Sequence, residues 1–207
     1  MIRWYAATSV ATLSLLLTGC ANVVTSPSSD TAAVNAPAAA YFPNIELNGR
    51  LSVRYQQNGK DEAVHGSFAW LQKSDRTVVK MMSPLGQTIA IIESAPGMSV
   101  LTQSRRPQRT APNVDTLASE ALGWPLPVAG LRDWLQGVGS DVNGKRFIAT
   151  PQNGNDMITT RDGWRIRYEA WENGGGSQHP KRIDLERHTA QAGEVAIRIV
   201  IDEWHPL

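Results

Sequence analysis

The residues of this chain that could carry out catalysis or hold a metal ion are few and widely separated. Its four histidines have no carboxylate or cysteine partners at the spacing that metal ligands need. They are His65, His179, His188 and His205. The sequence contains no Gly-x-Ser-x-Gly nucleophile motif, no His-Glu-x-x-His zinc motif, no phosphate-binding loop and no dinucleotide fingerprint. We therefore expect a protein that is not an enzyme and that uses no cofactor and no metal ion.

The charged residues suit the exposed face of a β-sheet better than a catalytic site. Arg182, Asp184 and Glu186 alternate with the apolar Ile183 and Leu185, a pattern that a cross-strand charge ladder explains. The 20 Lys and Arg residues balance 19 Asp and Glu residues, so the sequence predicts no basic surface for nucleic acid. A single cysteine excludes an internal disulfide framework. The hydrophobic content of 42% is typical of a packed domain.

The first 19 residues have the features of an export signal that is removed from the mature protein. Arg3 supplies the positive charge, and residues 6–17 form an apolar stretch too short to span a bilayer. The segment ends in Leu17-Thr18-Gly19-Cys20, which resembles the lipobox of bacterial lipoproteins. That resemblance implies cleavage before Cys20, a diacylglycerol on its thiol and a third acyl chain on its amino group. The alternative is an ordinary signal peptide that contains a cysteine by chance.

A triacylated Cys20 would hold the chain on a membrane, because stable anchoring needs at least two lipid chains. By resemblance to lipoprotein sorting, aspartate at the next position would favour the inner membrane, so Ala21 favours the outer membrane and its periplasmic face. Residues 20–43 are then the lipidated cysteine and a flexible tether, since this stretch is rich in Ala, Ser, Thr and Pro and carries a single charge. We expect one folded domain at residues 44–207.

From residue 47 onward, apolar and polar residues alternate with period two, which indicates half-buried antiparallel strands. Turn signals separate them at Asn58-Gly59-Lys60-Asp61, Ser83-Pro84-Leu85-Gly86 and Pro96-Gly97. The strands expected in this half of the chain lie at residues 47–55, 64–70, 77–82, 88–92 and 98–102.

The pattern changes to helical spacing after Pro112. Asn113 is a candidate N-cap for a first helix that ends at Gly123, and Pro127 can open a second helix that ends at Gly137. Further strands are expected around Phe147 and at residues 157–160, 164–169, 182–186 and 195–201. These elements predict an α+β fold, in which about ten or eleven strands form a strongly curved antiparallel sheet with two or three short helices in or over its concave face.

Several segments that follow one another along the chain carry a family resemblance. They are Leu47-Asn48-Gly49-Arg50-Leu51-Ser52-Val53, Ser83-Pro84-Leu85-Gly86, Gly123-Trp124-Pro125-Leu126-Pro127, Leu131-Arg132-Asp133-Trp134-Leu135-Gln136-Gly137, Gly163-Trp164-Arg165-Ile166-Arg167-Tyr168 and Pro180-Lys181-Arg182-Ile183. In this order they resemble the LolB family, the outer-membrane receptors for lipoproteins. The resemblance covers nearly the whole mature domain and agrees with the lipobox.

The resemblance implies an unclosed antiparallel barrel with helices as a lid over an apolar cavity that holds the acyl chains of lipoproteins. The implied partners are a soluble periplasmic carrier similar to LolA, triacylated lipoprotein cargo and the lipid of the outer membrane, with the receptor a monomer. The residues that we expect to contact acyl chains are Trp70, Met81, Ile92, Leu117, Leu131, Trp134, Ile183, Ile197 and Ile199.

Leu85 lies at the tip of a turn, where polar residues are usual. One interpretation is that it folds back over the edge of the sheet. The other comes from the resemblance, because the LolB family carries an apolar residue on a protruding loop that serves to insert cargo into the membrane. On that interpretation Pro84, Leu85 and Gly86 form the membrane-insertion loop.

Two other functions stay open on the sequence. The chain could be a lipid-anchored module that binds a small apolar ligand, with a barrel similar to that of lipocalins. It could also be a structural lipoprotein of the cell envelope, whose apolar strand faces form an ordinary filled core. The residues alone favour a filled core, and it is the family resemblance that favours a cavity.

Overall fold

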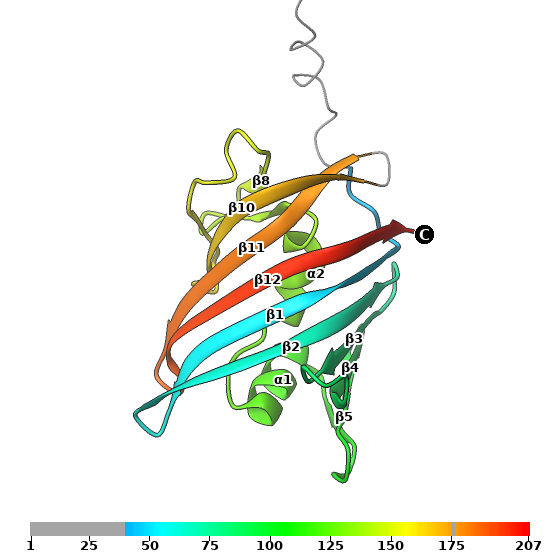
Figure 1. The fold of residues 1–207 in the computed structure, drawn as a ribbon, viewed down its shortest axis with the longest axis vertical. Helices are drawn as coiled ribbons and strands as arrows, with labels where there is room; N and C mark the ends of the chain where they lie inside the picture. The colour runs from blue at the N-terminus through cyan, green and yellow to red at the C-terminus, as the bar shows by residue number, and fades with distance from the viewer. Residues whose placement is uncertain (1–39, 175–176) are drawn as a thin grey trace, which may run out of the picture. The chain divides into compact units, whose positions relative to one another are not determined.

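The computed structural model describes residues 40–174 and 177–207, which form one large sheet, one small sheet and two helices (Figure 1). In chain order the elements are β1 (Ile45–Gln57), β2 (Lys60–Gln72), β3 (Thr77–Met82), β4 (Thr88–Ala95), β5 (Met98–Thr102), β6 (Arg109–Ala111), α1 (Val114–Leu122), α2 (Val128–Trp134), β7 (Val138–Ser140), β8 (Arg146–Ile148), β9 (Ile158–Thr159), β10 (Arg165–Gly174), β11 (Ser177–Thr189) and β12 (Gly193–Pro206). The predicted export signal, Cys20 and most of the predicted tether lie outside the described residues.

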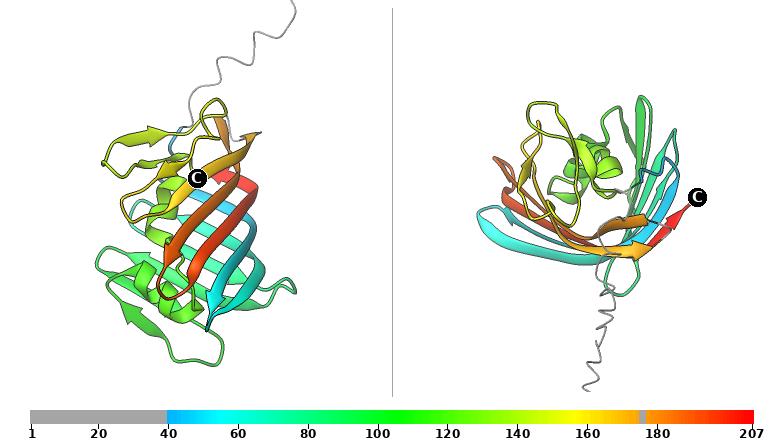
Figure 2. Two further views of the ribbon diagram at one scale, coloured as in Figure 1. Left: turned by 90° about the vertical axis from the view of Figure 1, so that its left-hand side faces the viewer. Right: turned by 90° about the horizontal axis from the view of Figure 1, so that it is seen from above.

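The large sheet has ten strands in the order β6-β5-β4-β3-β2-β1-β12-β11-β10-β9, and its strand pairs are antiparallel. The last strand, β12, pairs with the first, β1, in the middle of the sheet. Within the described part of the chain the edge strands β6 and β9 do not pair with each other, so the sheet curves around the helices without closing (Figure 2). The predicted α+β fold is confirmed, and β7 and β8 form a separate hairpin.

The β1–β2 hairpin shows how the alternating sequence forms this sheet. Asn58 and Gly59 join the strands with φ angles of 54° and 74°, which are the left-handed values of a two-residue type I′ turn. Leu51 of β1 lies opposite Ile199 of β12, and both side chains are buried on the concave face. Because successive side chains point to opposite faces, Ser52 and its polar neighbours Arg50 and Arg54 face outward.

A β-bulge lies between β1 and β12 near the centre of the sheet, with Asp202 of β12 as the extra residue, because Asn48 pairs with Glu203 and Gly49 with Ile201. The register with β12 shifts between Asn48 and Gly49. A Cβ atom on Gly49 would lie 2.2 Å from the carbonyl oxygen of Val200 and 2.8 Å from the ring of Phe68, so glycine is needed for this close approach. A bulge bends its strand and increases the local twist, and this helps the sheet to wrap around the helices.

Both helices begin, and α1 also ends, where capping chemistry predicts, but α2 ends at Trp134 and not at the predicted Gly137, because the chain tightens into a turn in which the Gly137 N–H donates to the Trp134 carbonyl. The Oδ1 atom of Asn113 accepts the backbone N–H of Thr116 at 2.9 Å, and α1 ends at Gly123, whose φ of 82° is left-handed. Pro127 precedes α2, as expected for a residue that fits the first turn but cannot continue a helix. Figure 2 shows both helices on the concave side of the large sheet, as the sequence predicted.

Two short strands, β6 and β7, were not predicted. β7 contains Gly139 and directly follows Gly137, and glycine weakens an isolated strand. A Cβ atom on Gly139 would lie 2.6 Å from the ring of Phe147 in β8, so the packing of this hairpin requires glycine. The same glycine weakens the strand signal in the sequence. β6 is three residues long and is held by its pairing with β5.

Neither helix of the described part of the chain is long and apolar enough to cross a membrane.

Candidate functional site

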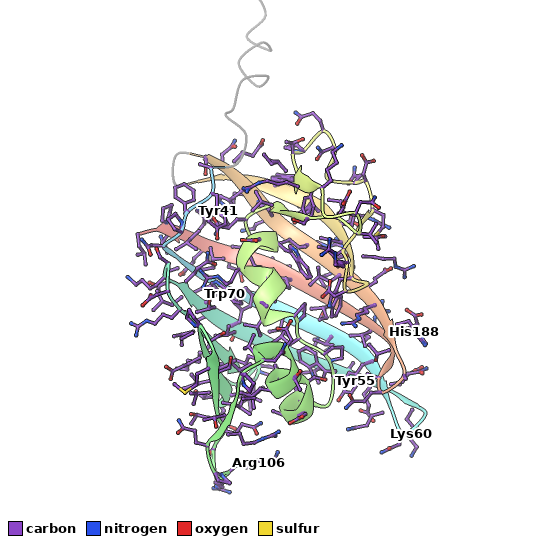
Figure 3. The ribbon with its side chains drawn as sticks, turned by 180° about the vertical axis from the view of Figure 1, so that it is seen from behind. Tyr41, Tyr55, Lys60, Trp70, Arg106 and His188 are labelled. Carbon is purple, nitrogen blue, oxygen red and sulfur yellow. The ribbon has the colours of Figure 1, made fainter. Side chains whose placement is uncertain are left out.

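The concave face of the large sheet is apolar, and α2 lies against it. In Figure 3 Trp70 of β2 lies beside this helix. Trp70 is opposite Val79 of β3, which in turn is opposite Ile92 of β4, so the three side chains form one apolar row. The indole N–H of Trp70 donates to the Oε1 atom of Gln72 at 3.3 Å, so the polar atom of this large side chain is satisfied within the core.

A small cavity remains between this face and α2. Its volume is about 20 Å³, which is room for little more than one water-sized sphere. The ten side chains that line it are all apolar: Leu51, Phe68, Trp70, Val79, Met81, Leu126, Leu131, Leu135, Ile197 and Ile199. In this conformation the void is therefore too small to hold an acyl chain.

Three leucines on or beside α2 line the cavity from the side of the helix. Leu131 lies in α2, Leu135 follows its last residue, and Leu126 lies in the linker before it. All three are buried. A movement of α2 away from the sheet would withdraw these side chains together and leave an apolar groove along β12, β1, β2 and β3.

The C-terminal end of α2 is bound to the sheet by hydrogen bonds. The guanidinium of Arg132 donates to the carbonyl of Lys73 at 2.9 Å and to the hydroxyl of Thr77. From the other side, the hydroxyl of Tyr168 in β10 donates to the carbonyl of Trp134 at 3.0 Å. Burial raises the pKa of Tyr168, so this hydroxyl keeps its proton and stays a donor. This end of the helix is thus fixed to both sides of the sheet.

The N-terminal end of α2 is bound to α1. The Oδ1 atom of Asp115 in α1 accepts the backbone N–H of Ala129 at 3.0 Å and so caps the first turn of α2. Burial raises the pKa of Asp115. The linker between the helices contacts the sheet through Trp124, whose ring lies 6.5 Å from that of Tyr55. Hydrogen bonds to the sheet are therefore concentrated at one end of α2 and helix–helix contacts at the other.

The nine residues predicted to contact acyl chains are all buried. Five of them line the cavity, namely Trp70, Met81, Leu131, Ile197 and Ile199. The other four, Ile92, Leu117, Trp134 and Ile183, belong to the same apolar core but do not line the cavity in this conformation. Acyl contact stays a prediction for all nine.

Five cavity residues were not among the sequence candidates. Four of them occupy apolar positions of predicted strands and helices, namely Leu51, Phe68, Val79 and Leu135. The alternation of apolar and polar residues predicts that these side chains are buried, but it does not show which buried residues surround a cavity. Leu126 lies between two prolines in a linker and has no periodic signal.

The loop between β3 and β4 presents Leu85 to solvent. Its side chain is 88% exposed, although leucine gains nothing from contact with water. The turn is closed by a hydrogen bond from the Gly86 N–H to the Ser83 carbonyl at 2.9 Å, and the Gln87 N–H donates to the Ser83 hydroxyl at 3.2 Å. Leu85 therefore does not fold back over the edge of the sheet. It extends from a defined turn, with Pro84 and Gly86 on either side.

Three of the four histidines have a defined aromatic or carboxylate neighbour. His179 is buried and stacks on Trp204 with ring centres 4.2 Å apart, and burial lowers its pKa. His188 lies 3.1 Å from Glu194, and His205 lies 3.8 Å from Glu203. Among residues 40–174 and 177–207, no group of three or more His, Cys, Asp and Glu residues could hold a metal ion.

The sequence matches known proteins along most of its length. The family model described as outer membrane lipoprotein LolB matches residues 43–204. The outer-membrane lipoprotein LolB of Cupriavidus taiwanensis is 39% identical over 197 residues, covering 93% of each chain, and that of Bordetella pertussis is 31% identical over 203 residues, covering 98% of this chain and 94% of the relative. Among solved structures, a LolA superfamily protein from Nitrosomonas europaea aligns with a TM-score of 0.44 at 11% identity, covering 80% of this chain and 88% of the other.

Proposed function

The chain belongs to the LolB family of outer-membrane lipoproteins, and from this premise we propose that it accepts lipoproteins from a periplasmic carrier and inserts them into the outer membrane. The acyl chains of the cargo would bind between α2 and the concave face of the large sheet. The carrier would be similar to LolA. The proposed activity is transfer of a bound molecule and not catalysis.

The observation that carries this proposal is the small, wholly apolar cavity between the sheet and α2, which three leucines line from the side of the helix. Burying an acyl chain gains about 0.8 kcal/mol for each CH₂, so one chain of about 15 carbons gains about 12 kcal/mol. Exposing a leucine costs about 1.5–3 kcal/mol, so withdrawing Leu126, Leu131 and Leu135 costs about 4.5–9 kcal/mol. Relative to exposure in water, burying one acyl chain therefore gains more than withdrawing the three leucines costs, and burying three chains gains several times that cost.

The hydrogen bonds of α2 suggest how the cavity opens. Arg132 and Tyr168 fix the C-terminal end of the helix to the sheet, whereas Asp115 ties its N-terminal end to α1. We infer that α2 pivots about residues 135–137 and that its N-terminal end lifts together with α1. Gly137 has a left-handed φ of 76° and can absorb the change of backbone direction.

The exposed Leu85 supports a role for the β3–β4 loop in the last step. One leucine that enters a bilayer gains about 1.5–3 kcal/mol, which is sufficient to bias a brief encounter but not to anchor the protein. Pro84, Leu85 and Gly86 would thus bring the loaded domain to the membrane surface while the cargo leaves. Stable attachment would depend on acyl chains at Cys20, on the periplasmic face of the outer membrane.

A transfer experiment tests this function. The carrier is loaded with one fluorescent lipoprotein and mixed with the purified receptor, and the bound cargo is followed by size and by native mass spectrometry. We expect cargo to move from the carrier to the receptor without any nucleotide. A receptor that never takes up cargo, or that retains only a small apolar molecule, would instead support the small-ligand module.

A further inference from the structure

A second hollow lies on the outer face of the large sheet, opposite to the acyl cavity. This groove has a volume of about 500 Å³. Its polar and loop-derived lining residues are Arg50, Ser52, His65, Ser67, Pro84 and Arg198, and we call it the outer groove. No carboxylate is among its lining residues, which are all within the described part of the chain.

The strand register explains why these side chains meet. On β1, Arg50 lies opposite Ser67 of β2, and Ser52 lies opposite His65 of β2 and Arg198 of β12. Arg50 and Arg198 are therefore diagonal neighbours on adjacent antiparallel strands, a relationship that places Cα atoms about 7–8 Å apart. Two arginines, two hydroxyls and an imidazole thus form one compact block on three adjacent strands.

Both arginines are held in place by carboxylates outside the groove. The Nε and Nη2 atoms of Arg50 donate to Asp202 at 2.8 Å each, and those of Arg198 donate to Asp184 at 3.0 Å each. The hydrogen bonds from Arg50 hold the pKa of Asp202 below its usual value. Among the described residues, neither Nη1 atom makes a hydrogen bond, so each guanidinium is oriented in advance and keeps donors for an oxyanion.

The outer groove is continuous with the loop that carries Leu85. Pro84 lines the groove, and the next residue is the most exposed large apolar side chain among the described residues. A loop that inserts Leu85 into the apolar part of a bilayer would bring the adjacent groove to the depth of the lipid headgroups. Those headgroups carry phosphodiesters, whose charge and acceptor oxygens are complementary to two arginines and two serines.

We propose that the outer groove binds the phosphate of a membrane phospholipid while Leu85 enters the bilayer, an inference that rests on the proposed role of the loop. Binding at this site orients the domain, because the groove and the acyl cavity lie on opposite faces of one sheet. It also makes membrane docking dependent on salt, since interactions between charges at a membrane surface are screened by ions.

The test measures cosedimentation with vesicles of digalactosyldiacylglycerol, a neutral lipid without phosphate, and phosphatidylglycerol. The protein is the unlipidated chain from residue 21 onward, which contains every described helix and strand. Arg50→Gln and Arg198→Gln are each expected to weaken vesicle binding about fivefold, as one basic residue near an anionic surface does. Arg165→Gln is the matched control, because Arg165 forms a similar outer-face ion pair with Glu186 at 2.9 Å but does not line the groove.

Two further binding measurements identify the ligand of the outer groove. Vesicles in which a fatty acid supplies the same negative charge should bind more weakly than those with phosphatidylglycerol, because a carboxylate is not the proposed ligand. Inorganic phosphate should compete only at high concentration, since the site is proposed to bind phosphate held in a membrane. Equal binding to both kinds of vesicle, or equal losses in Arg165→Gln and the two groove variants, would overturn the proposal.

Leu85→Glu separates this inference from the function on which it rests. If Leu85→Glu abolishes vesicle binding and the groove variants bind like the unmodified chain, the loop inserts and the outer groove has no role. If Leu85→Glu binds like the unmodified chain, the proposed role of the loop is wrong. The thermal stability of every variant is measured alongside, so that a fall in vesicle binding can be assigned to the membrane surface.

Discussion

The side chain of Gln136 binds both backbone polar groups of Phe42. Its Oε1 atom accepts the Phe42 N–H at 2.7 Å, and its Nε2 atom donates to the Phe42 carbonyl at 3.0 Å. Gln136 is 1% exposed and follows the C-terminal end of α2, whereas Phe42 precedes β1. The ring of Phe42 also meets Trp204 edge-on at 6.4 Å. The segment that leads into the domain therefore holds the fixed end of the helix that covers the cavity.

Gln136→Ala should loosen α2. The change leaves the amide and carbonyl of Phe42 without partners in a partly buried position, which costs about 1–3 kcal/mol. We expect backbone amides of α2 to exchange faster with deuterium and an apolar fluorescent probe to enter the cavity faster. Gln56→Ala removes an exposed hydrogen bond to Asp61 and should change neither rate. Equal exchange of α2 in Gln136→Ala and the unmodified chain would contradict the pivot.

Leu131→Ala should lower the unfolding free energy of the domain and raise its affinity for an acyl chain. Removing this buried side chain costs about 2–5 kcal/mol of unfolding free energy, because a larger cavity is left behind. The same cavity is space that an acyl chain no longer has to clear, so the affinity for a fatty acid probe should rise. Leu101→Ala serves as the control, since Leu101 is buried in β5, does not line the cavity and is not among the predicted acyl contacts. It should lower stability similarly without raising affinity, and a similar rise in both variants would show that general loosening is the cause.

Local rules predicted most of the fold, because the signals involved are short-range. Asn58 and Gly59 form the turn that their types predict, and Asn113 caps the helix that its position predicts. Those rules could not predict which of the buried residues line the cavity. Ile183 and Ile197 have the same period and burial, yet only Ile197 borders the void, because the void depends on where α2 crosses the sheet.

The two hydrogen bonds between Gln136 and Phe42 could not be predicted either, since they join residues 94 positions apart. Tyr41 and Phe42 belong to the stretch that its composition marks as a tether, and yet they contact the domain. The hydroxyl of Tyr41 accepts a hydrogen bond from Gln72 at 3.1 Å, and burial together with the nearby Asp133 raises its pKa. Composition averages over a stretch and does not detect two aromatic residues at its end.

Leu85→Glu should separate the two steps of transfer. The side chain is exposed and its turn is closed by backbone contacts, so we expect unchanged thermal stability and unchanged acceptance of cargo from the carrier. Incorporation of that cargo into liposomes should fall sharply, because a carboxylate does not enter the apolar part of a bilayer. Equal losses in both steps, or a large fall in melting temperature, would show that Leu85 is a structural residue.

Cys20 should be the lipidated N-terminus of the mature protein. Mass spectrometry of protein extracted from membranes is expected to show a chain that begins at Cys20 and carries three acyl chains, as the preceding Leu17-Thr18-Gly19 suggests. The chain from residue 21 onward, exported by another signal, should fold with the same stability because the buried core lies between Ile45 and Trp204. A mature N-terminus elsewhere or a free thiol at Cys20 would refute the proposed anchor.

The most direct measurement of the central claim is photocrosslinking from neighbouring positions of β12. Ile197 lines the cavity on the concave face, whereas Ala196 points to the outer face. A diazirine amino acid is placed at either position, the carrier delivers a lipoprotein with labelled acyl chains, and the mixture is irradiated. We predict crosslinks to the acyl chains from position 197 and none above background from position 196. Equal crosslinking from the two positions, or none from position 197 while cargo is bound, would contradict an acyl-binding cavity beneath α2.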